Sequence, residues 1–201
     1  MTNDLPLSKE QILDTAEQVL KRFGPDKTSV VDVARALQVS HGTLYRHFAS
    51  KAALREAVTE RWLRRIIAEP LAALAELPGV SAAERLRQWV AALIAAKRTY
   101  AADDPELFKM YADVTLETGD MIDTHICGLI GQMASIIAAG VASGELKPVD
   151  PEDTARAIFI ATSKFHHPSH AREWQAERAD REFDIVWRLL LQGIVPDVRQ
   201  A

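Results

Sequence analysis

Apolar residues recur at helical spacing near the start of the chain. Five apolar positions between Ile12 and Phe23 fall on one face of a helix, because side chains three and four residues apart lie above one another. Ser8 and Gln11 have the spacing of a capping box, which satisfies free amides at a helix start. Gly24-Pro25 ends the pattern, so a first helix of about four turns is predicted.

Three further helical segments follow closely. The second is expected over Val30–Leu37, the third over His41–His47, and the fourth, a longer one, from Lys51 onward. Each is preceded by a serine, the residue type that accepts a hydrogen bond from the first free amides of a helix. These N-cap residues are Ser29, Ser40 and Ser50.

Helical periodicity continues to the end of the chain, interrupted by proline and glycine. The interruptions expected to bend or end helices are Pro70, Leu77-Pro78-Gly79, Asp104-Pro105, Gly119-Asp120, Asp150-Pro151 and His166-His167-Pro168. Ser81 and Glu84 form a second capping box, and a last helix is expected over about Arg172–Leu191. Alternation typical of strands is rare, so the sequence predicts an all-α chain of about nine helices.

Composition narrows the class of protein. The chain has 201 residues, of which 48% are hydrophobic and 26% charged, enough apolar material for a folded core. A single cysteine rules out an internal disulfide framework and any zinc site built on paired cysteines. The longest wholly apolar stretch, Trp89–Ala96, is too short to cross a bilayer, and the polar N-terminus has no signal pattern. A cytoplasmic protein is therefore expected.

Charge is unevenly distributed along the chain. The formal net charge is −4, but residues 1–65 carry 11 Lys/Arg against 8 Asp/Glu, which gives +3. The remaining residues carry 13 against 20, which gives −7. A basic front on an acidic body indicates that the front faces an anion such as DNA, although charged faces are usually solvated surface.

The segment from Thr28 to Lys51 has the layout of a helix-turn-helix. Two short helices are joined by a tight turn, and in such motifs the second helix enters the major groove of DNA. Leu44 and Phe48, four residues apart, are expected to face inward and dock this helix on the first two. The residues left facing outward are His41, Gly42, Thr43, Tyr45, Arg46 and His47.

These outward residues suggest a division of labour on DNA. Glycine in a helix interior lowers helix stability by about 1 kcal/mol relative to alanine. Gly42 is therefore expected where the backbone of the helix must approach DNA closely. Thr43 can offer its hydroxyl or methyl group to a base edge, whereas the next three residues suit phosphates. Lys51, at a helix N-terminus, also favours phosphate. The predicted DNA-binding set is Thr28, Ser40, His41, Gly42, Thr43, Tyr45, Arg46, His47 and Lys51.

The same residues resemble a known family. Thr28-Ser29-Val30, Asp32-Val33-Ala34, Gly42-Thr43-Leu44-Tyr45-Arg46-His47-Phe48 and Ser50-Lys51, with Phe23-Gly24 before them, are similar to the TetR family of bacterial transcriptional regulators over residues 8–62. The resemblance implies a homodimer on a palindromic operator, most often a repressor released by a small molecule. It also implies a helix-turn-helix domain over residues 1–50 and a C-terminal helical ligand-binding and dimerisation domain over 51–201, linked by the fourth helix.

The same residues also admit explanations that do not involve DNA binding. The helix-turn-helix shape alone also occurs in helical proteins that do not bind DNA. Tyr45 could pack its ring on the first helix, and His47 could be an ordinary surface histidine. His41 and Ala49 depart from residue types usual in the family, which leaves the operator sequence open but not DNA binding.

Aromatic and methionine residues are frequent in the C-terminal part, where most should belong to the core. A subset is expected to line an apolar ligand pocket between helices: Trp62, Trp89, Phe108, Tyr111 and Met121. The acidic balance of this part argues against an anionic inducer.

The last two helices carry apolar stripes suited to a four-helix dimer interface, with packing inside the monomer as the alternative. The predicted interface residues are Phe159, Phe183, Val186, Trp187 and Leu190.

No metal or cofactor is expected. His166, His167 and His170 are close in sequence, but Pro168 interrupts the helix between them and no metal-binding motif supports a site. Cys127 is expected to be a small core residue.

Two other functions compete with a ligand-responsive repressor. One is a DNA-binding regulator without small-molecule input, controlled by a protein partner or by concentration. The other is an all-α enzyme, but nucleophile-elbow, phosphate-loop and dinucleotide-binding motifs do not occur in the sequence.

Overall fold

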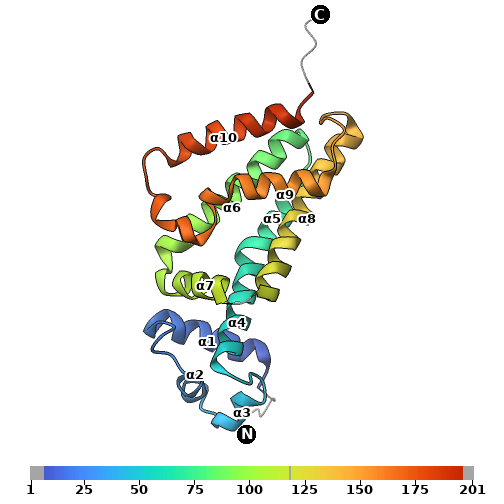
Figure 1. Ribbon diagram of the computed structural model, residues 1–201. Coiled ribbons are helices and arrows are strands. Elements are labelled where there is room, and N and C mark those ends of the chain that lie inside the picture. Colours follow the sequence, from blue (N-terminus) through green and yellow to red (C-terminus); the bar gives the residue numbers. More distant parts are fainter. Residues whose placement is uncertain (1–6, 118, 197–201) are drawn as a thin grey trace, which may run out of the picture. The chain divides into compact units, whose positions relative to one another are not determined.

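The computed structural model describes residues 7–117 and 119–196, which contain ten α-helices and no strand (Figure 1). The chain divides into two compact units, the first made of Met1–Trp62 and Asp103–Met121, the second of Leu63–Ala102 and Ile122–Ala201. The all-α expectation is confirmed. The division differs from the predicted boundary at residue 50, because α4 stays with the first unit and a later segment joins it.

The first unit contains five helices: α1 (Lys9–Phe23), α2 (Val30–Ala36), α3 (His41–Tyr45), α4 (Lys51–Trp62) and α7 (Pro105–Glu117). The second contains a π-helical segment η1 (Leu63–Ala68), α5 (Glu69–Ala75), α6 (Ala82–Asp103), α8 (Gly119–Ser143), α9 (Pro151–Ala161), two 3₁₀ segments, η2 (Ser163–Phe165) and η3 (Pro168–Glu173), and α10 (Ala179–Ile194).

The predicted signals at the ends of α1 are present. The Ser8 side chain accepts from the Gln11 backbone N–H, and the Gln11 side chain accepts from the Ser8 N–H, which completes the capping box. At the other end Gly24 has φ 79°, a left-handed conformation that glycine adopts without strain. A side chain at Gly24 would also meet the Glu106 carboxylate. The apolar stripe of α1 is buried as predicted.

Helix α7 belongs to the first unit through ion pairs. Lys21 of α1 lies 2.9 Å from the Asp104 carboxylate, just before α7. Lys109 of α7 pairs with Asp26 at 3.0 Å, in the loop between α1 and α2. Since the partners are more than 80 residues apart in sequence, no local pattern could have predicted this arrangement.

Arg61 fastens α4 to α1. Its guanidinium is 4% exposed and lies 2.7 Å from Asp14, 2.9 Å from Glu17 and 3.3 Å from Glu10. The three acidic residues are spaced three or four apart, so they share one face of α1. A planar guanidinium with several donors suits such a multiple contact.

The fourth predicted helix is divided where the sequence indicated only a bend. Helix α4 ends at Trp62, and η1 continues as a π-helix before α5 begins at Glu69. Pro70 has no N–H to donate to the carbonyl four residues earlier, which favours a widened turn ahead of it. This division accounts for the tenth helix.

Helix α8 passes a simple test for a membrane span. It is 25 residues long, and its most apolar window has a mean hydropathy of 1.7, with 39% of that window buried in the structure. Core helices of soluble proteins meet the same criteria, so this single helix gives little support to a membrane span. The expectation that no segment is long and apolar enough was still wrong, because glycine, alanine and serine extend the helix beyond its apolar runs.

The chain end differs from prediction between residues 162 and 178. Helix α9 ends at Ala161, and α10 begins at Ala179 instead of Arg172. The buried Trp174 explains the difference, because its indole N–H donates to the Lys164 carbonyl at 3.0 Å and holds the segment in short 3₁₀ turns.

The predicted dimer stripe is divided between core and surface. Phe183 and Trp187 are buried, and Phe183 packs edge-on against Phe165 with ring centroids 5.5 Å apart. Phe159, Val186 and Leu190 are half-buried. Apolar side chains that remain exposed on α9 and α10 are Ile160, Ile185 and Leu189. Both stripes lie on helices, as expected, but Phe183 and Trp187 belong to the core of the monomer. The dimer interface remains a prediction.

Candidate nucleic-acid interface

Helix α2 begins with a complete capping box. The Ser29 side chain accepts from the Asp32 N–H, and the Asp32 carboxylate accepts from both the N–H and the hydroxyl of Ser29, at 2.9 and 2.6 Å. These hydrogen bonds, with the nearby Arg35, hold the pKa of Asp32 below its usual range. Asp32 is therefore a carboxylate at neutral pH and fixes the start of the helix.

The turn between α2 and α3 is a Schellman motif. The Val39 N–H donates to the Ala34 carbonyl at 3.0 Å, and the Gln38 N–H donates to the Arg35 carbonyl at 3.1 Å. Gln38 occupies the left-handed position of the motif with φ 57°, where glycine is usual. The turn ends α2 sharply and releases the chain into the N-cap of α3.

Helix α3 is docked by two buried residues. Ser40 caps its first turn by accepting from the Thr43 N–H at 3.2 Å. Leu44 is 0% exposed and Phe48 4% exposed, as the four-residue spacing predicted. The helix ends at Tyr45 instead of His47, because Arg46 is its C-cap.

The remaining positions of this segment face solvent. His41, Gly42, Tyr45, Arg46 and His47 are exposed, and Thr43 is half-buried. The Thr43 hydroxyl lies 2.9 Å from the Ser40 hydroxyl and 3.4 Å from the Arg46 guanidinium, so these three side chains are neighbours. Tyr45 is 49% exposed, which disagrees with the alternative that its ring packs on α1. The segment presents a continuous polar surface with one cationic group.

Packing within the chain does not require a glycine at position 42. A Cβ atom built on it would meet only the Ser40 hydroxyl at 3.8 Å, an ordinary contact. Alanine would therefore fit within the chain, so packing within the protein does not explain the cost of glycine at this exposed helix position.

Lys51 extends the polar surface to the start of α4. Its ammonium group donates to the Asp26 carbonyl at 3.3 Å, which holds the side chain beside the first turn. Ser50 accepts from the Ala53 N–H at 3.0 Å. The first turn of a twelve-residue helix and an adjacent cation together suit a phosphate group.

Thr28 does not belong to this exposed set. It is 3% exposed, and its hydroxyl donates to the Gly24 carbonyl at 2.7 Å. Its backbone N–H donates to the same carbonyl at 3.1 Å. Both donors are used within the chain, so the prediction of a DNA contact by Thr28 is corrected to a structural role in the loop before α2.

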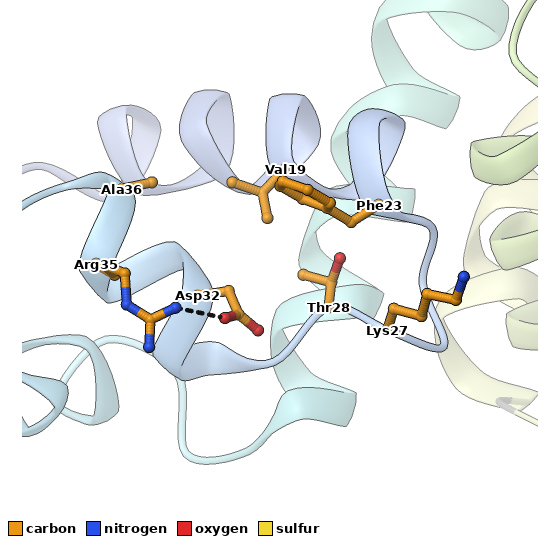
Figure 2. A pocket seen from close by; sticks show the side chains of 7 residues that line it. All are labelled: Val19, Phe23, Lys27, Thr28, Asp32, Arg35 and Ala36. Carbon is orange, nitrogen blue, oxygen red and sulfur yellow. Dashed lines mark hydrogen bonds and ion pairs between the residues drawn. The ribbon is translucent and has the colours of Figure 1, made fainter.

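Thr28 lies in a groove of about 390 Å³ between α1 and α2 (Figure 2). Val19 and Phe23 border it from α1, and α2 contributes the ion pair of Arg35 with Asp32 at 3.1 Å. Lys27 stands at the edge near the loop.

Sequence reasoning left out two exposed cations of this region, Lys27 and Arg35. Arg35 has a side chain 75% exposed, and it lies on the helix that crosses the DNA backbone in motifs of this type. The polar face of the second predicted helix could have indicated Arg35 as a candidate for contact with the DNA backbone.

The five residues predicted for a ligand pocket are distributed over both units. Trp62 and Phe108 pack against Tyr111 in the first unit, with ring centroids 5.3 and 5.8 Å from it. Met121 is half-buried at the end of that unit's second segment. Trp89, fully buried in the second unit, donates its indole N–H to the Gln132 side chain at 3.1 Å. The pocket remains a prediction.

The sequential histidines do not gather as ligands of a metal. The His167 side chain is hydrogen-bonded to the Ser169 hydroxyl, and the His170 side chain is hydrogen-bonded to the Glu173 carboxylate. His166 is buried. Within the described residues, no three His, Cys, Asp or Glu side chains are grouped so as to hold a metal ion. Cys127 is exposed, so the expectation of a core residue was wrong.

A capped helix, a tight turn and a second helix form a helix-turn-helix, and the exposed polar and cationic side chains on the second helix are typical of the DNA-binding class of this motif. Comparison with known proteins agrees. Residues 12–58 match the family of bacterial regulatory proteins of the tetR type, and residues 82–187 match the tetracyclin repressor-like C-terminal domain. The chain therefore belongs to the TetR family of bacterial transcriptional regulators.

Individual relatives cover nearly the whole chain. A helix-turn-helix transcriptional regulator of Mycobacterium tuberculosis is 30% identical over 97% of this chain and 87% of its own length. The crystal structure of a TetR-family regulator from Mesorhizobium loti superposes with a TM-score of 0.72 at 19% identity, covering 93% of this chain and 96% of that one. FadR of Bacillus subtilis, solved in complex with stearoyl-CoA, gives a TM-score of 0.63 at 22% identity, covering 92% and 99%.

Proposed function

We propose that this regulator is a repressor that binds a palindromic operator as a homodimer and is released by a small-molecule effector in the bacterial cytoplasm. The observation that carries the proposal is the polar surface of α3, held outward by the burial of Leu44 and Phe48. A side chain set that neither packs nor pairs strongly within the chain is free to contact another molecule.

On DNA, the residues of this surface divide by chemistry. Thr43, near the start of α3, faces the base edges, where its methyl or hydroxyl group distinguishes one base from another. Tyr45, Arg46 and His47 face the phosphates beside it. Lys51, with Lys27 and Arg35, adds cations along the backbone, and together they supply the salt-dependent part of the affinity.

Two copies are needed to read a palindrome. The exposed Ile160, Ile185 and Leu189 on α9 and α10 supply apolar surface for a second copy, since exposed apolar patches on soluble proteins mark interaction sites. Val186 and Leu190, half-buried beside them, extend that face. A two-fold dimer places two α3 helices on successive major grooves.

The effector is expected in the C-terminal unit. The match to the tetracyclin repressor-like C-terminal domain supports this place. The structure of FadR in complex with stearoyl-CoA supports the expectation that a regulator of this fold binds an effector. A ligand that binds the DNA-free form more tightly than the DNA-bound form shifts the equilibrium toward release.

The test is a gel-shift titration of the full chain against the DNA upstream of its own gene. We expect a specific complex whose logarithmic affinity falls linearly with the logarithm of salt concentration. A chain that forms no specific complex, or one insensitive to salt, would refute DNA binding through this surface. A complex that forms but never responds to metabolites would instead favour a regulator without small-molecule input.

A further inference from the structure

Five charged side chains of the first unit form a network that joins three segments of the chain. Lys51 and Arg55 lie four residues apart on α4, so they share one face of that helix. Lys109 and Asp113 have the same spacing on α7, and Asp26 lies in the loop between α1 and α2. We refer to these five residues as the charge network.

Cations and carboxylates alternate along the charge network. The Lys109 ammonium lies 3.0 Å from the Asp26 carboxylate and 3.1 Å from the carboxylate of Asp113. The Asp113 carboxylate also lies 3.7 Å from the Arg55 guanidinium. The Lys51 ammonium contacts Asp26 as well, but through a hydrogen bond to the backbone carbonyl at 3.3 Å. Among the residues that the structure describes, Lys51 forms no ion pair, so its positive charge is not neutralised within the network.

The carboxylate of Asp26 is paired chiefly with Lys109. The hydrogen bond and the charge of Lys109 hold the pKa of Asp26 below its usual range, with smaller contributions from Arg55 and Lys51. Asp26 is therefore negatively charged at neutral pH. Because its backbone carbonyl already contacts the Lys51 ammonium, rotation about the side-chain torsions would bring its carboxylate toward the same ammonium.

A carboxylate turned toward Lys51 would oppose the binding of DNA. It would compete with a phosphate for the same ammonium, since both are oxyanions that accept charge-assisted hydrogen bonds. The Asp26 side chain is 75% exposed, so nothing but its ion pair restricts this rotation strongly. Lys51 with an unpaired Asp26 has no net charge, whereas the two residues together with Lys109 carry one positive charge. That remaining charge is available to attract a phosphate.

We propose that Lys109, on α7, is a positioning residue for DNA binding, which holds the Asp26 carboxylate away from Lys51 and leaves the Lys51 ammonium available to a DNA phosphate. The proposal rests on the proposed function, since it assumes that Lys51 contacts phosphate. Lys109 acts through the other two residues and does not itself touch DNA. The determinants of DNA affinity thereby extend to a helix outside the helix-turn-helix.

The contacts on α7 suit Lys109 to this role. Asp113, one helical turn further along, holds the Lys109 ammonium in place from its own helix. Hydrogen bonds to Asp26 and Asp113 raise the pKa of Lys109, so the ammonium stays charged well above neutral pH. Asp113 has Arg55 as a second cation, and it therefore does not draw Lys109 away from the loop.

A purely structural role for the ion pair is the alternative. In that case the pair between Lys109 and Asp26 would only fasten the loop before α2. Exposed ion pairs contribute little to stability, and the loop is also held by Thr28, whose hydroxyl and N–H both donate to the Gly24 carbonyl. Breaking the pair from either side should then have the same effect on DNA binding.

Two substitutions that break the same ion pair distinguish these explanations. Lys109→Met leaves an unpaired carboxylate beside Lys51, whereas Asp26→Asn removes that carboxylate. We expect Lys109→Met to weaken DNA binding about two- to five-fold at about 50 mM salt and to reduce the salt slope by at most about one. Asp26→Asn should bind at least as tightly as the natural chain. Fluorescence anisotropy of the full-length protein with the DNA upstream of its gene, and with a scrambled fragment of equal length, measures both. The two fragments should respond alike, because phosphates carry no sequence information.

Further variants test whether the effect passes through Asp26 and Lys51. Lys109→Arg keeps the charge and should keep the natural affinity. Asp26→Asn added to Lys109→Met should restore binding, and Lys109→Met should have little effect when Lys51 is already alanine. Lys164→Met is the matched control, because Lys164 also bridges two carboxylates and is 42% exposed, but lies in the second unit. It should leave the affinity unchanged.

Several outcomes would overturn the proposal. They are unchanged affinity in Lys109→Met, equal weakening by Lys109→Met and Asp26→Asn, no restoration in the double variant, and a full effect of Lys109→Met in the absence of Lys51. Urea denaturation checks that each variant is folded, and Lys109→Gln replaces Lys109→Met with the same expected outcomes if the latter does not fold. A natural chain that forms no salt-dependent complex would refute the proposed function, and this inference with it. A natural chain that binds DNA no more tightly than Lys109→Met would refute this inference alone.

Discussion

Gln38 holds a backbone conformation that glycine adopts at lower cost. Its φ of 57° is left-handed, and an L side chain in that region is disfavoured by about 1 kcal/mol. We expect Gln38→Gly to raise the free energy of unfolding by about 0.5–1 kcal/mol, with part of the gain offset by the greater freedom of glycine in the unfolded chain. Urea denaturation measures the change. Gln38→Ala is the control and should change stability little, because it keeps the strained geometry.

Thr43 and Lys51 should separate base reading from phosphate binding. Thr43→Ala removes a group placed toward the bases, so we expect altered preference at one operator position, worth about 1–3 kcal/mol. Lys51→Ala should weaken binding to every sequence by a similar factor and reduce the salt slope by about one. Binding to an operator and to a scrambled fragment over a range of salt measures both. Indistinguishable effects of the two variants would contradict the division of roles.

Lys97 should give the protein an unusual dependence of stability on pH. The unfolded chain holds the lysine proton up to its ordinary pKa of 10.5, whereas the folded chain releases it near pH 7. Unfolding therefore takes up a proton between these values, and stability rises with pH by at most about 1.4 kcal/mol per unit. Lys97→Met should be more stable than the natural chain near pH 7 and should lack this rise. Denaturation between about pH 7 and 10 measures both, and parallel curves for the two chains would show that the lysine is solvated.

At the scale of the elements, the contact between α1 and α4 depends on one side chain. Arg61 is buried among Glu10, Asp14 and Glu17, so Arg61→Met leaves three neighbouring carboxylates without their shared cation. We expect a loss of about 2 kcal/mol, below the value for a fully buried pair, because two of the acids are largely exposed. Arg35→Met removes an exposed pair and should cost about 0.5 kcal/mol or less. Equal losses of unfolding free energy in the two variants would contradict a stabilising role for the contacts of Arg61.

Helix α10 carries a prediction about assembly. Leu189 is 71% exposed and Ile185 50% exposed, four residues apart on one face. We expect the double variant Ile185→Lys and Leu189→Lys to be a folded monomer, because four buried ammonium groups would oppose a two-fold dimer. Sedimentation velocity measures the oligomeric state. Leu116→Lys, at a position 78% exposed in the first unit, is the control and should leave assembly unchanged.

For the molecule as a whole, sequence reasoning succeeded where the deciding signals are local. The caps at Ser8, Ser29 and Ser40 and the stop at Gly24 involve residues within a few positions of one another, so their spacing defines the helix ends. The inward direction of Leu44 and Phe48 follows from the same geometry.

Sequence reasoning failed where partners are distant. Arg61 contacts acidic residues 44 to 51 positions earlier, and nothing local distinguishes it from an ordinary surface arginine. Phe183 and Trp187 were expected at a dimer interface, because an apolar stripe on a helix indicates that the stripe is covered but not what covers it. Cys127 was expected in the core, because the apolar residues around it in the sequence do not show which face of α8 is buried.

The membership of α7 in the first unit bears on how proteins of this architecture can be divided or recombined. The chain passes from one unit to the other at residues 62, 102 and 121, so the first unit is not a contiguous piece of sequence. A fragment ending at Trp62 would lose the partners that Asp104 and Lys109 provide to Lys21 and Asp26, and it would expose the face of Trp62 that packs on Tyr111. A single crossover between two regulators would therefore join an α4 and an α7 that did not evolve together. In a chimaera that exchanges the second unit between two such proteins, α7 must therefore come from the same protein as the DNA-binding helices.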